Sequence, residues 1–345
     1  MAAIRKASHA GSWYTDDPEE LDASLSEWLS DVEDSTLPSP LSVCSTSASS
    51  SSTPLPLPVP ASRAIIAPHA GYSYSGPAAA YAYRTIDTSS IRNVFILGPS
   101  HHVYLDGCAV SACSAYETPL GNLRINREIT EELKATGKFS TMSKSEDEDE
   151  HSIEMHLPYI YKVFEGKNIQ IVPILVGAIN TSKENEFGKL LAKYVEDPSN
   201  FFVVSSDFCH WGSRFRYTYY KPSGSSLATN LTSRSSRDML ESKPIHQSIR
   251  ELDEAGILAI THPWSQDGEK TAEQARLAFA KYLSETKNTV CGRHPIGVLL
   301  SALAELERSG KRSEARFTRY EQSSKCMTAH DSSVSYASAF VRFRE

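Results

Sequence analysis

The stretch that decides the fold is RAIIAPHAGY (63–72), in which a short apolar run leads directly into polar residues. Two further stretches have the same form, RNVFILGPSHH (92–102) and NFFVVSSDFCHWG (200–212). Apolar runs of this length, rich in β-branched or aromatic residues and closed by Gly, Pro or Ser, predict strands that are buried on both faces. The sequence therefore predicts an open α/β sheet.

Each of these runs ends in ionisable side chains: His69, His101 with His102, and Asp207 with His210. Ligands of open α/β sheets bind at the carboxyl ends of the strands. A single histidine at such a place is more often a strand cap that bonds to loop backbone. Because the pattern occurs three times, we expect neighbouring strands to gather imidazole and carboxylate groups for metal binding or acid/base chemistry.

The remaining periodic segments complete a single domain. Asp17 and Pro18 predict a helix start, and Leu21, Leu25 and Trp28 then follow at helical spacing. The other expected elements are strands at 170–178 and 334–343 and helices at 186–197, 271–285 and 295–310.

Two stretches predict disordered insertions within that domain, which otherwise spans 1–345. Residues 35–62 are crowded with Ser and Pro, and residues 221–246 are almost as poor in core-forming side chains. Such compositions bury too little apolar area to offset the entropy lost on ordering.

Composition excludes several classes of protein. The chain has 345 residues, 40% of them hydrophobic, and a net charge of −7. It has no basic stripe with interleaved aromatic residues, no apolar run long enough to span a membrane and no signal-peptide pattern, so we expect no nucleic-acid partner and no membrane insertion. The six cysteines form no CxxC pair, which favours free thiols in the cytoplasm or nucleus.

Cys291 is a further candidate site residue, because it precedes a helix that we expect to begin near Pro295. A thiol near a helix N-terminus, with Arg293 and His294 beside it, should have a depressed pKa. A buried, inert cysteine is the alternative interpretation.

The segment EDEHSIEMHLPYI (148–160) does not match the zinc-protease motif, because its two histidines do not share a helix face. We expect the acidic run Glu146 to Glu150 to be a solvated turn. It leads into a helix whose His156 should face the site.

Six blocks of the sequence together resemble the Memo family, the mediators of ErbB-driven cell motility. They are distributed along almost the whole chain except the two insertions: ASHAGSWY (7–14), APHAGYSYSG (67–76), FILGPSHHVYL (95–105), EDEHSIEMHLPY (148–159), VVSSDFCHWGSRFRY (203–217) and CGRHPIGVLL (291–300).

The resemblance implies a mixed central sheet flanked by helices, similar to the class III extradiol dioxygenases. In those non-haem iron enzymes two histidines and a glutamate hold the metal. By position, His69 and His101 match the histidine ligands, Cys291 stands in place of the glutamate, and His210 matches an acid/base histidine with Asp207 nearby. A thiolate makes the site softer, so that copper or zinc suits it as well as iron, and ring cleavage does not follow from the resemblance.

Three functions remain open. The first is a redox protein with one transition metal ion, copper or iron with zinc as a further candidate, bound by His69, His101 and Cys291. The second is a signalling adaptor without catalysis that binds phosphotyrosine-containing peptides between Trp13, Tyr72, Tyr74 and His156. The third is a cysteine hydrolase with Cys291 as nucleophile and His210 as base. The sequence does not determine the oligomeric state.

Overall fold

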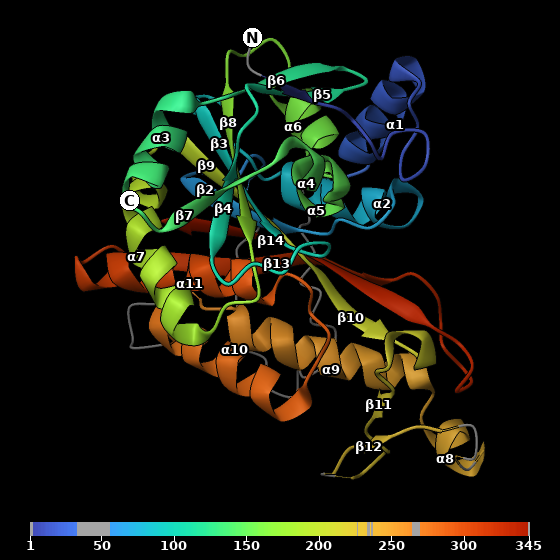
Figure 1. The fold of residues 1–345 in the computed structure, drawn as a ribbon. Coiled ribbons are helices and arrows are strands. Elements are labelled where there is room, and N and C mark those ends of the chain that lie inside the picture. Colours follow the sequence, from blue (N-terminus) through green and yellow to red (C-terminus); the bar gives the residue numbers. More distant parts are fainter. Residues whose placement is uncertain are drawn as a thin grey trace.

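The structure is a computed structural model that describes residues 3–32, 56–225, 227–232, 235, 237–263 and 270–343. A twisted mixed sheet runs through the molecule, and helices cover both of its faces (Figure 1). The predicted α/β class with a mixed central sheet is therefore confirmed.

The main sheet contains strands in the order β1-β5-β6-β8-β3-β9-β2-β14-β10, with β13 paired to β14, and β4 paired to β8 and β7. Its strands are β1 (Ile4–Arg5), β2 (Ser62–Ala67), β3 (Asn93–Pro99), β4 (Cys108–Ser111), β5 (Ala115–Thr118), β6 (Gly121–Ile125), β7 (Phe139–Met142), β8 (Gln170–Val176), β9 (Asn200–Ser205), β10 (Asp207–Trp211), β13 (Ser313–Gln322) and β14 (Ser333–Phe343). A separate two-stranded ribbon pairs β11 (Tyr219–Tyr220) with β12 (Thr229–Asn230).

The helices pack on both faces of this sheet (Figure 1). They are α1 (Pro18–Ser30), α2 (Tyr72–Tyr83), α3 (Arg127–Ala135), α4 (Lys144–Asp149), α5 (His151–Glu154), α6 (Leu157–Val163), α7 (Thr181–Glu196), α8 (Arg237–Ser242), α9 (Ile245–Ile260), α10 (Ala272–Thr286) and α11 (Arg293–Arg308), with a 3₁₀ turn at Ser213–Phe215. None of the described helices is long and apolar enough to span a bilayer.

The three strands that carry the candidate site residues are neighbours, as predicted. Strands β3, β9 and β2 lie side by side and run parallel, with Val203 of β9 opposite both Ile96 of β3 and Ile65 of β2. The expected single strand over 200–212 is wrong in one respect, because it breaks at Ser206. Strand β9 ends at Ser205, and β10 begins at Asp207 and pairs antiparallel with β14.

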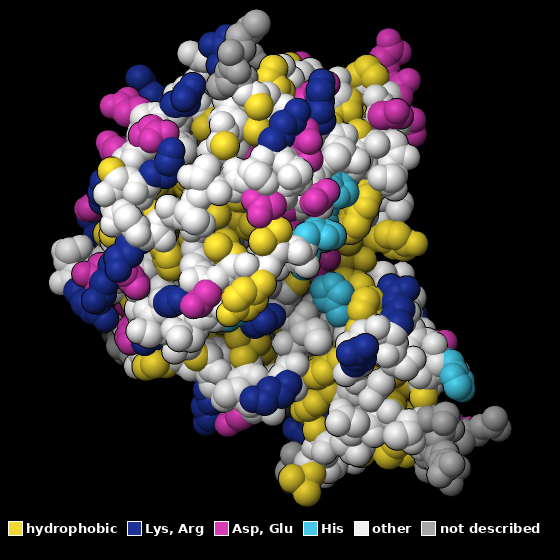
Figure 2. All heavy atoms as spheres, viewed as in Figure 1, with side chains coloured by type: hydrophobic (Ala, Val, Ile, Leu, Met, Phe, Trp, Pro, Cys, Tyr) yellow, Lys and Arg dark blue, Asp and Glu magenta, His cyan; other side chains and the backbone are white. Residues whose placement is uncertain are grey.

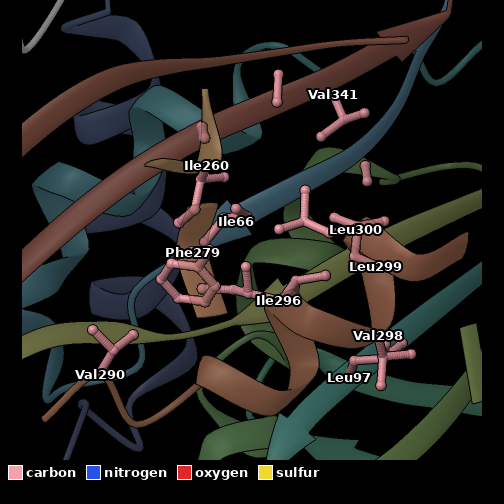
Figure 3. Packing of buried hydrophobic residues seen from close by; sticks show 14 of the residues in the cluster. Ile66, Leu97, Ile260, Phe279, Val290, Ile296, Val298, Leu299, Leu300 and Val341 are labelled. Carbon is pink, nitrogen blue, oxygen red and sulfur yellow. The ribbon is translucent and has the colours of Figure 1, made fainter. Parts of the chain in front are cut away.

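Successive side chains of these strands point to opposite faces of the sheet, so they contribute to two cores, one on each face. Ile65 and Val203 belong to the cluster beneath α1, α2 and α6, whereas Ile66 and Val204 belong to the cluster beneath α7 and α11. Figure 3 shows Ile66 and Ile296 of α11 in this second cluster. Burial on both faces explains why the runs are apolar at every position, and it makes the strand ends a rigid base for the site.

The N-terminal helix forms as its sequence predicts. Asp17 caps α1 by accepting hydrogen bonds from the backbone N–H groups of Glu19 and Glu20, both at 2.9 Å. Leu21 and Leu25 are buried against the rest of the fold. The cap and the apolar stripe therefore fix both the start and the orientation of this helix.

The boundaries of both predicted insertions need correction. Most of 35–62 lies outside the described residues, but Val59 is fully buried and Ser62 already begins β2. Within 221–246 the structure contains β12, α8 and the first residues of α9, and Leu231 and Ile245 are buried in the core. A few well-placed apolar side chains anchor this stretch despite its polar composition.

Candidate metal centre

His69 lies two residues beyond the end of β2 and is 2% exposed. Its Nδ1 is 2.6 Å from Oγ of Ser205, and the Ser205 hydroxyl donates to the carbonyl oxygen of Ser152 at 2.7 Å. Because that hydroxyl proton is already used, Nδ1 of His69 must carry the proton and Nε2 the lone pair. Burial, and after it the charge of His101, hold the pKa of His69 well below its usual value. His69 is therefore a neutral imidazole whose Nε2 is available to a proton or a metal ion.

His101 follows β3 in the same way and is held by Glu150. Its Nδ1 is 2.9 Å from Oε1 of Glu150, and its backbone N–H donates to Oε2 at 2.7 Å. Burial alone would raise the pKa of Glu150, but the hydrogen bonds and charge of His101 outweigh it and bring the pKa to about 2. An ionised carboxylate only accepts hydrogen bonds, so Nδ1 of His101 is the donor and Nε2 is the ring nitrogen that remains for a ligand. Carboxylate–histidine pairs of this kind orient metal ligands in proteins.

His151 is a third imidazole at this place, contributed by the start of α5 rather than by a strand end. Its ring stacks on those of His101 and Trp13, each with centroids 4.4 Å apart, and lies 5.5 Å from that of His69. Burial, followed by the charge of His101, lowers the pKa of His151 to about 3. Its Nδ1 is buried without a hydrogen-bond partner among the described residues. The nearest carboxylate oxygen, Oε1 of Glu150, is 3.7 Å away, so this ring nitrogen inside a histidine cluster fits a metal-binding role.

Cys291 contacts the free nitrogen of His69, with Sγ 3.2 Å from Nε2. Its Sγ also accepts a hydrogen bond from the backbone N–H of Asp207 at 3.1 Å, and the buried Asp207 carboxylate accepts the backbone N–H of His69 at 2.9 Å. Gly292 allows this close approach, because a Cβ at that position would lie 2.3 Å from the carbonyl oxygen of Ser205. Thiol, imidazole and carboxylate are thus held together by backbone contacts.

From the sequence we expected the helix terminus, Arg293 and His294 to lower the pKa of the Cys291 thiol. In the protein without a bound metal this expectation is wrong. Burial raises the pKa of this thiol well above its usual value, and the carboxylate of Asp207 raises it further. The expected partners face elsewhere, because Nδ1 of His294 is 2.7 Å from Glu184 and Arg293 is solvent-exposed. A bound cation would favour both the thiolate and the carboxylate, so the donor set suits a metal better than it suits a free nucleophile.

The potential ligand atoms form two groups, and within each group the atoms lie within 4.8 Å of one another. One group is His69, His101 and His151, and the other is His69, Asp207 and Cys291. His69 belongs to both, and its Nδ1 is occupied by Ser205. A single free nitrogen binds one ion, so the two groups are parts of one site around Nε2 of His69. The predicted ligands His101 and Cys291 lie in different parts of that site.

His210 lies in β10 next to this site. Its Nδ1 is 3.0 Å from the carbonyl oxygen of Phe208 and 3.2 Å from that of Thr289, and its backbone N–H donates to the Thr289 hydroxyl at 2.7 Å. The expectation that Asp207 fixes the imidazole tautomer is therefore wrong, because backbone carbonyls take that role. They place the proton on Nδ1 and leave Nε2 as the acceptor of a proton. The structure pairs Cys291 with His69, and among the described residues no hydrogen bond joins Cys291 to His210, the base in the hydrolase hypothesis.

A buried carboxylate behind β10 connects the segments that carry His210 and Cys291. Oδ1 of Asp253 accepts hydrogen bonds from the backbone of Cys209 at 3.2 Å and from the side chain of Asn288 at 2.9 Å. The Asn288 side-chain oxygen in turn accepts the backbone N–H of Thr289 at 2.7 Å. Burial raises the pKa of Asp253 to about 6, although its hydrogen bonds, including one from Tyr320, oppose this rise.

The acidic run is only partly the solvated turn that we expected from the sequence, because it forms a short helix in which Asp149 is exposed whereas Asp147 and the following Glu150 are buried. Asp147, Glu150 and Glu154 are each at most 2% exposed. Arg5 of β1 binds the Glu154 carboxylate at 2.7 Å and the backbone carbonyl oxygens of Asp147 and Glu150 at 2.8 and 2.9 Å. This buried cation therefore fixes the segment that supplies Glu150 and His151, and it explains why the acidic residues are buried.

The structure separates the four predicted ligand-binding side chains. Trp13, 36% exposed, stacks on His151 at the edge of the site, and Tyr74 is 60% exposed. Tyr72 is a core residue instead, because its hydroxyl donates to the carbonyl oxygen of Met155 at 2.8 Å and its ring is buried. His156 belongs to neither ligand group: it is buried with Nδ1 2.8 Å from the hydroxyl of Tyr83, and its Nε2 has no hydrogen-bond partner among the described residues. The histidine of this segment that joins the site is His151.

Comparison with known proteins agrees with the sequence blocks quoted above. The family model described as Memo-like protein matches residues 5–340. The chain is 47% identical to Protein MEMO1 of Rattus norvegicus and of Homo sapiens, over 96% of this chain and 95% of each relative, and 42% identical to the Protein memo-1 homolog of Caenorhabditis elegans, over 98% of this chain and 82% of that relative. The chain belongs to the Memo family.

The site of this Memo protein lies where the body of the molecule meets the part that carries β10, β11 and β12. Figure 2 shows histidine side chains reaching the surface there, close to acidic ones. The family match covers every residue of the cluster described above, from Arg5 to Arg293. Of these, the strand-end pattern could not reveal Glu150 and His151, because they come from another part of the chain, and it could not reveal the role of Ser205, because a serine at a strand end is not ionisable.

Proposed function

We propose that this protein binds one transition metal ion, copper or iron, and acts as an intracellular redox protein. The observation that supports the proposal is the orientation of two imidazoles. Ser205 and Glu150 hold His69 and His101 by Nδ1, so that Nε2 is the ring nitrogen that each presents to a ligand. The thiol of Cys291 lies 3.2 Å from the first of these nitrogens. Imidazole and thiolate suit Cu(I), Fe and Zn, whereas they do not suit hard cations such as Mg²⁺.

In this proposal the predicted ligands are His69, His101 and Cys291, with His151 and Asp207 as additional donors beside His69. The metal supplies one-electron transfer when it is bound. His210 holds a proton acceptor at Nε2 because its Nδ1 is occupied by backbone carbonyls. The resemblance to the Memo family adds a role in cell motility and growth signalling to the proposal.

Metal titration of protein purified without oxygen and without metal-binding tags tests this function. We expect about one Cu(I) or Fe(II) per chain, and severe loss of affinity in His69→Ala and Cys291→Ala. Cys113→Ala and His246→Ala are the matched controls, because both residues lie outside the ligand groups. Full wild-type affinity in both site variants would refute the proposal.

A second function, an adaptor that binds phosphotyrosine-containing peptides, is favoured by the exposed aromatic side chains beside the site. The backbone N–H of Tyr72 donates to the carbonyl oxygen of Trp13 at 2.9 Å, which joins the segment of Trp13 to the start of the helix that carries Tyr74. Fluorescence anisotropy with a labelled phosphotyrosine peptide and metal-free protein should then show binding that Trp13→Ala/Tyr74→Ala weakens. Leu277→Ala, which removes an exposed apolar side chain elsewhere, should have no effect. Absence of binding by the metal-free protein would exclude this function.

A further inference from the structure

A cavity of about 580 Å³ lies outside the histidine cluster, where α7, α10 and α11 meet. Figure 1 shows these helices together on one side of the sheet. The cavity is lined by the start of α7, the end of α10 and the start of α11, and also by Asn288 and Thr289 between the last two helices. None of the metal-ligand candidates lines it. Its volume is typical of a small-molecule site.

One wall of this cavity is apolar. Phe279, which is 2% exposed, and Leu283 both come from α10, one turn apart, and Ala280 lies between them. Figure 3 shows the Phe279 ring within the core cluster, so this wall is a continuation of rigid core packing. A rigid apolar wall favours a flat or branched hydrocarbon group.

The polar part of the lining has an excess of positive charge. Arg276 is paired with Glu273 at 2.7 Å, and His294 with Glu184 at 2.7 Å, so these charges are matched within the protein. Lys287 and Arg293 also line the cavity, and neither forms an ion pair within the described part of the chain. Because the whole protein carries a net charge of −7, two unmatched cations at one cavity are a local feature and not a general property of its surface.

We propose that this cavity is a second binding site, for a small organic anion with an apolar body. The hydrocarbon part lies against Phe279 and Leu283, and the carboxylate, sulfonate or phosphate group lies between Lys287 and Arg293. The cavity shares Thr289 with the metal centre, since the carbonyl and hydroxyl groups of this residue hold His210. An occupant would therefore contact the short segment that leads to Cys291. The binding itself does not depend on the proposed metal function.

The charge requirement is tested with two fluorescent probes that share an aromatic body, anionic 1-anilinonaphthalene-8-sulfonate and neutral N-phenyl-1-naphthylamine. Both are titrated into the metal-free full chain. Lys287→Gln/Arg293→Gln should weaken binding of the anionic probe by at least about fivefold, the scale of two exposed charge contacts, and should leave the neutral probe nearly unaffected. Lys189→Gln/Arg312→Gln removes the same charge from exposed positions that do not line the cavity and should leave both probes unaffected.

The location is tested by Ala280→Trp, which fills the cavity from its apolar wall and should abolish binding of both probes. Circular dichroism and the melting temperature establish that each variant is folded, and His69→Ala should bind the anionic probe as the wild type does. The proposal is overturned if the double variant keeps wild-type affinity for the anionic probe, if folded Ala280→Trp still binds it, or if His69→Ala loses it. Failure of metal binding in the wild type would leave this result unchanged.

Discussion

Nδ1 of His101 lies 2.9 Å from Oε1 of Glu150, a residue 49 positions further along the chain. The carboxylate also accepts the backbone N–H groups of His101 and Ser152. A single glutamate therefore fixes the ring orientation of His101 and the position of its loop. This relationship makes Glu150 the part of the site on which the geometry of His101 depends.

Glu150→Gln should lower metal affinity roughly 10- to 100-fold, the usual effect of losing a carboxylate that orients a ligand. Glutamine has the same shape, but its amide holds the imidazole less strongly than a carboxylate does. Competition titration with a chelator measures the effect. Asp149→Asn is the control, because it removes a neighbouring exposed carboxylate. Equal affinities in Glu150→Gln and wild type would show that His101 does not act as a ligand.

His210→Gln should leave metal stoichiometry and affinity nearly unchanged while redox turnover falls by about 10²- to 10⁴-fold, the typical range for loss of an acid/base group. The reason is that Nδ1 of His210 bonds to backbone carbonyls and His210 belongs to neither ligand group. Oxygen consumption or copper redox cycling is measured alongside metal content. Loss of the metal in this variant would identify His210 as a ligand instead.

Asp253 should make stability depend on pH between about 4 and 6. Its pKa rises from 3.8 to about 6 on folding, so its stabilising contribution is complete below pH 3.8 and is lost as the pH rises through 6. This difference corresponds to about 3 kcal/mol. Urea unfolding should therefore show the free energy of unfolding of the wild type, relative to Asp253→Asn, falling by up to that amount between pH 4 and pH 7. The exposed Asp16→Asn should show no such trend, and parallel pH profiles of wild type and Asp253→Asn would contradict the assignment.

Gly292→Ala should destabilise the protein and weaken metal binding together. The added Cβ would lie 2.3 Å from both the carbonyl oxygen of Ser205 and the Cβ of Ser206, so the segment carrying Cys291 must shift. Overpacking of this kind costs about 1–3 kcal/mol. Thermal unfolding and metal titration measure the two effects. Gly107→Ala, where the nearest atom would be 3.9 Å away, should be almost neutral, and a neutral Gly292→Ala would show that the segment adapts freely.

The sequence by itself determined the strands of the parallel core, and with them the positions of His69, His101 and Asp207. Strands β2, β3 and β9 are apolar at consecutive positions because both of their faces are buried. This pattern can be recognised within each short segment of the sequence. The cap at Asp17 is equally local, since all of its partners lie within three residues. That ligand sites lie at the carboxyl ends of parallel strands only suggested that these strands are neighbours, and the structure shows that they are.

Only the tertiary structure decided which polar residues are buried and which nitrogen of each histidine is free. The acidic run at 146–150 has the composition of a solvated turn, yet Arg5, more than 140 residues away, pairs with the buried Asp147 and binds the backbone carbonyl oxygens of Asp147 and Glu150. The choice of His151 over His156 depends on how α5 and α6 pack, and the free Nε2 of His69 depends on Ser205. Such contacts join residues far apart in the chain, so no local pattern encodes them: the fold alone brings the donors and acceptors together.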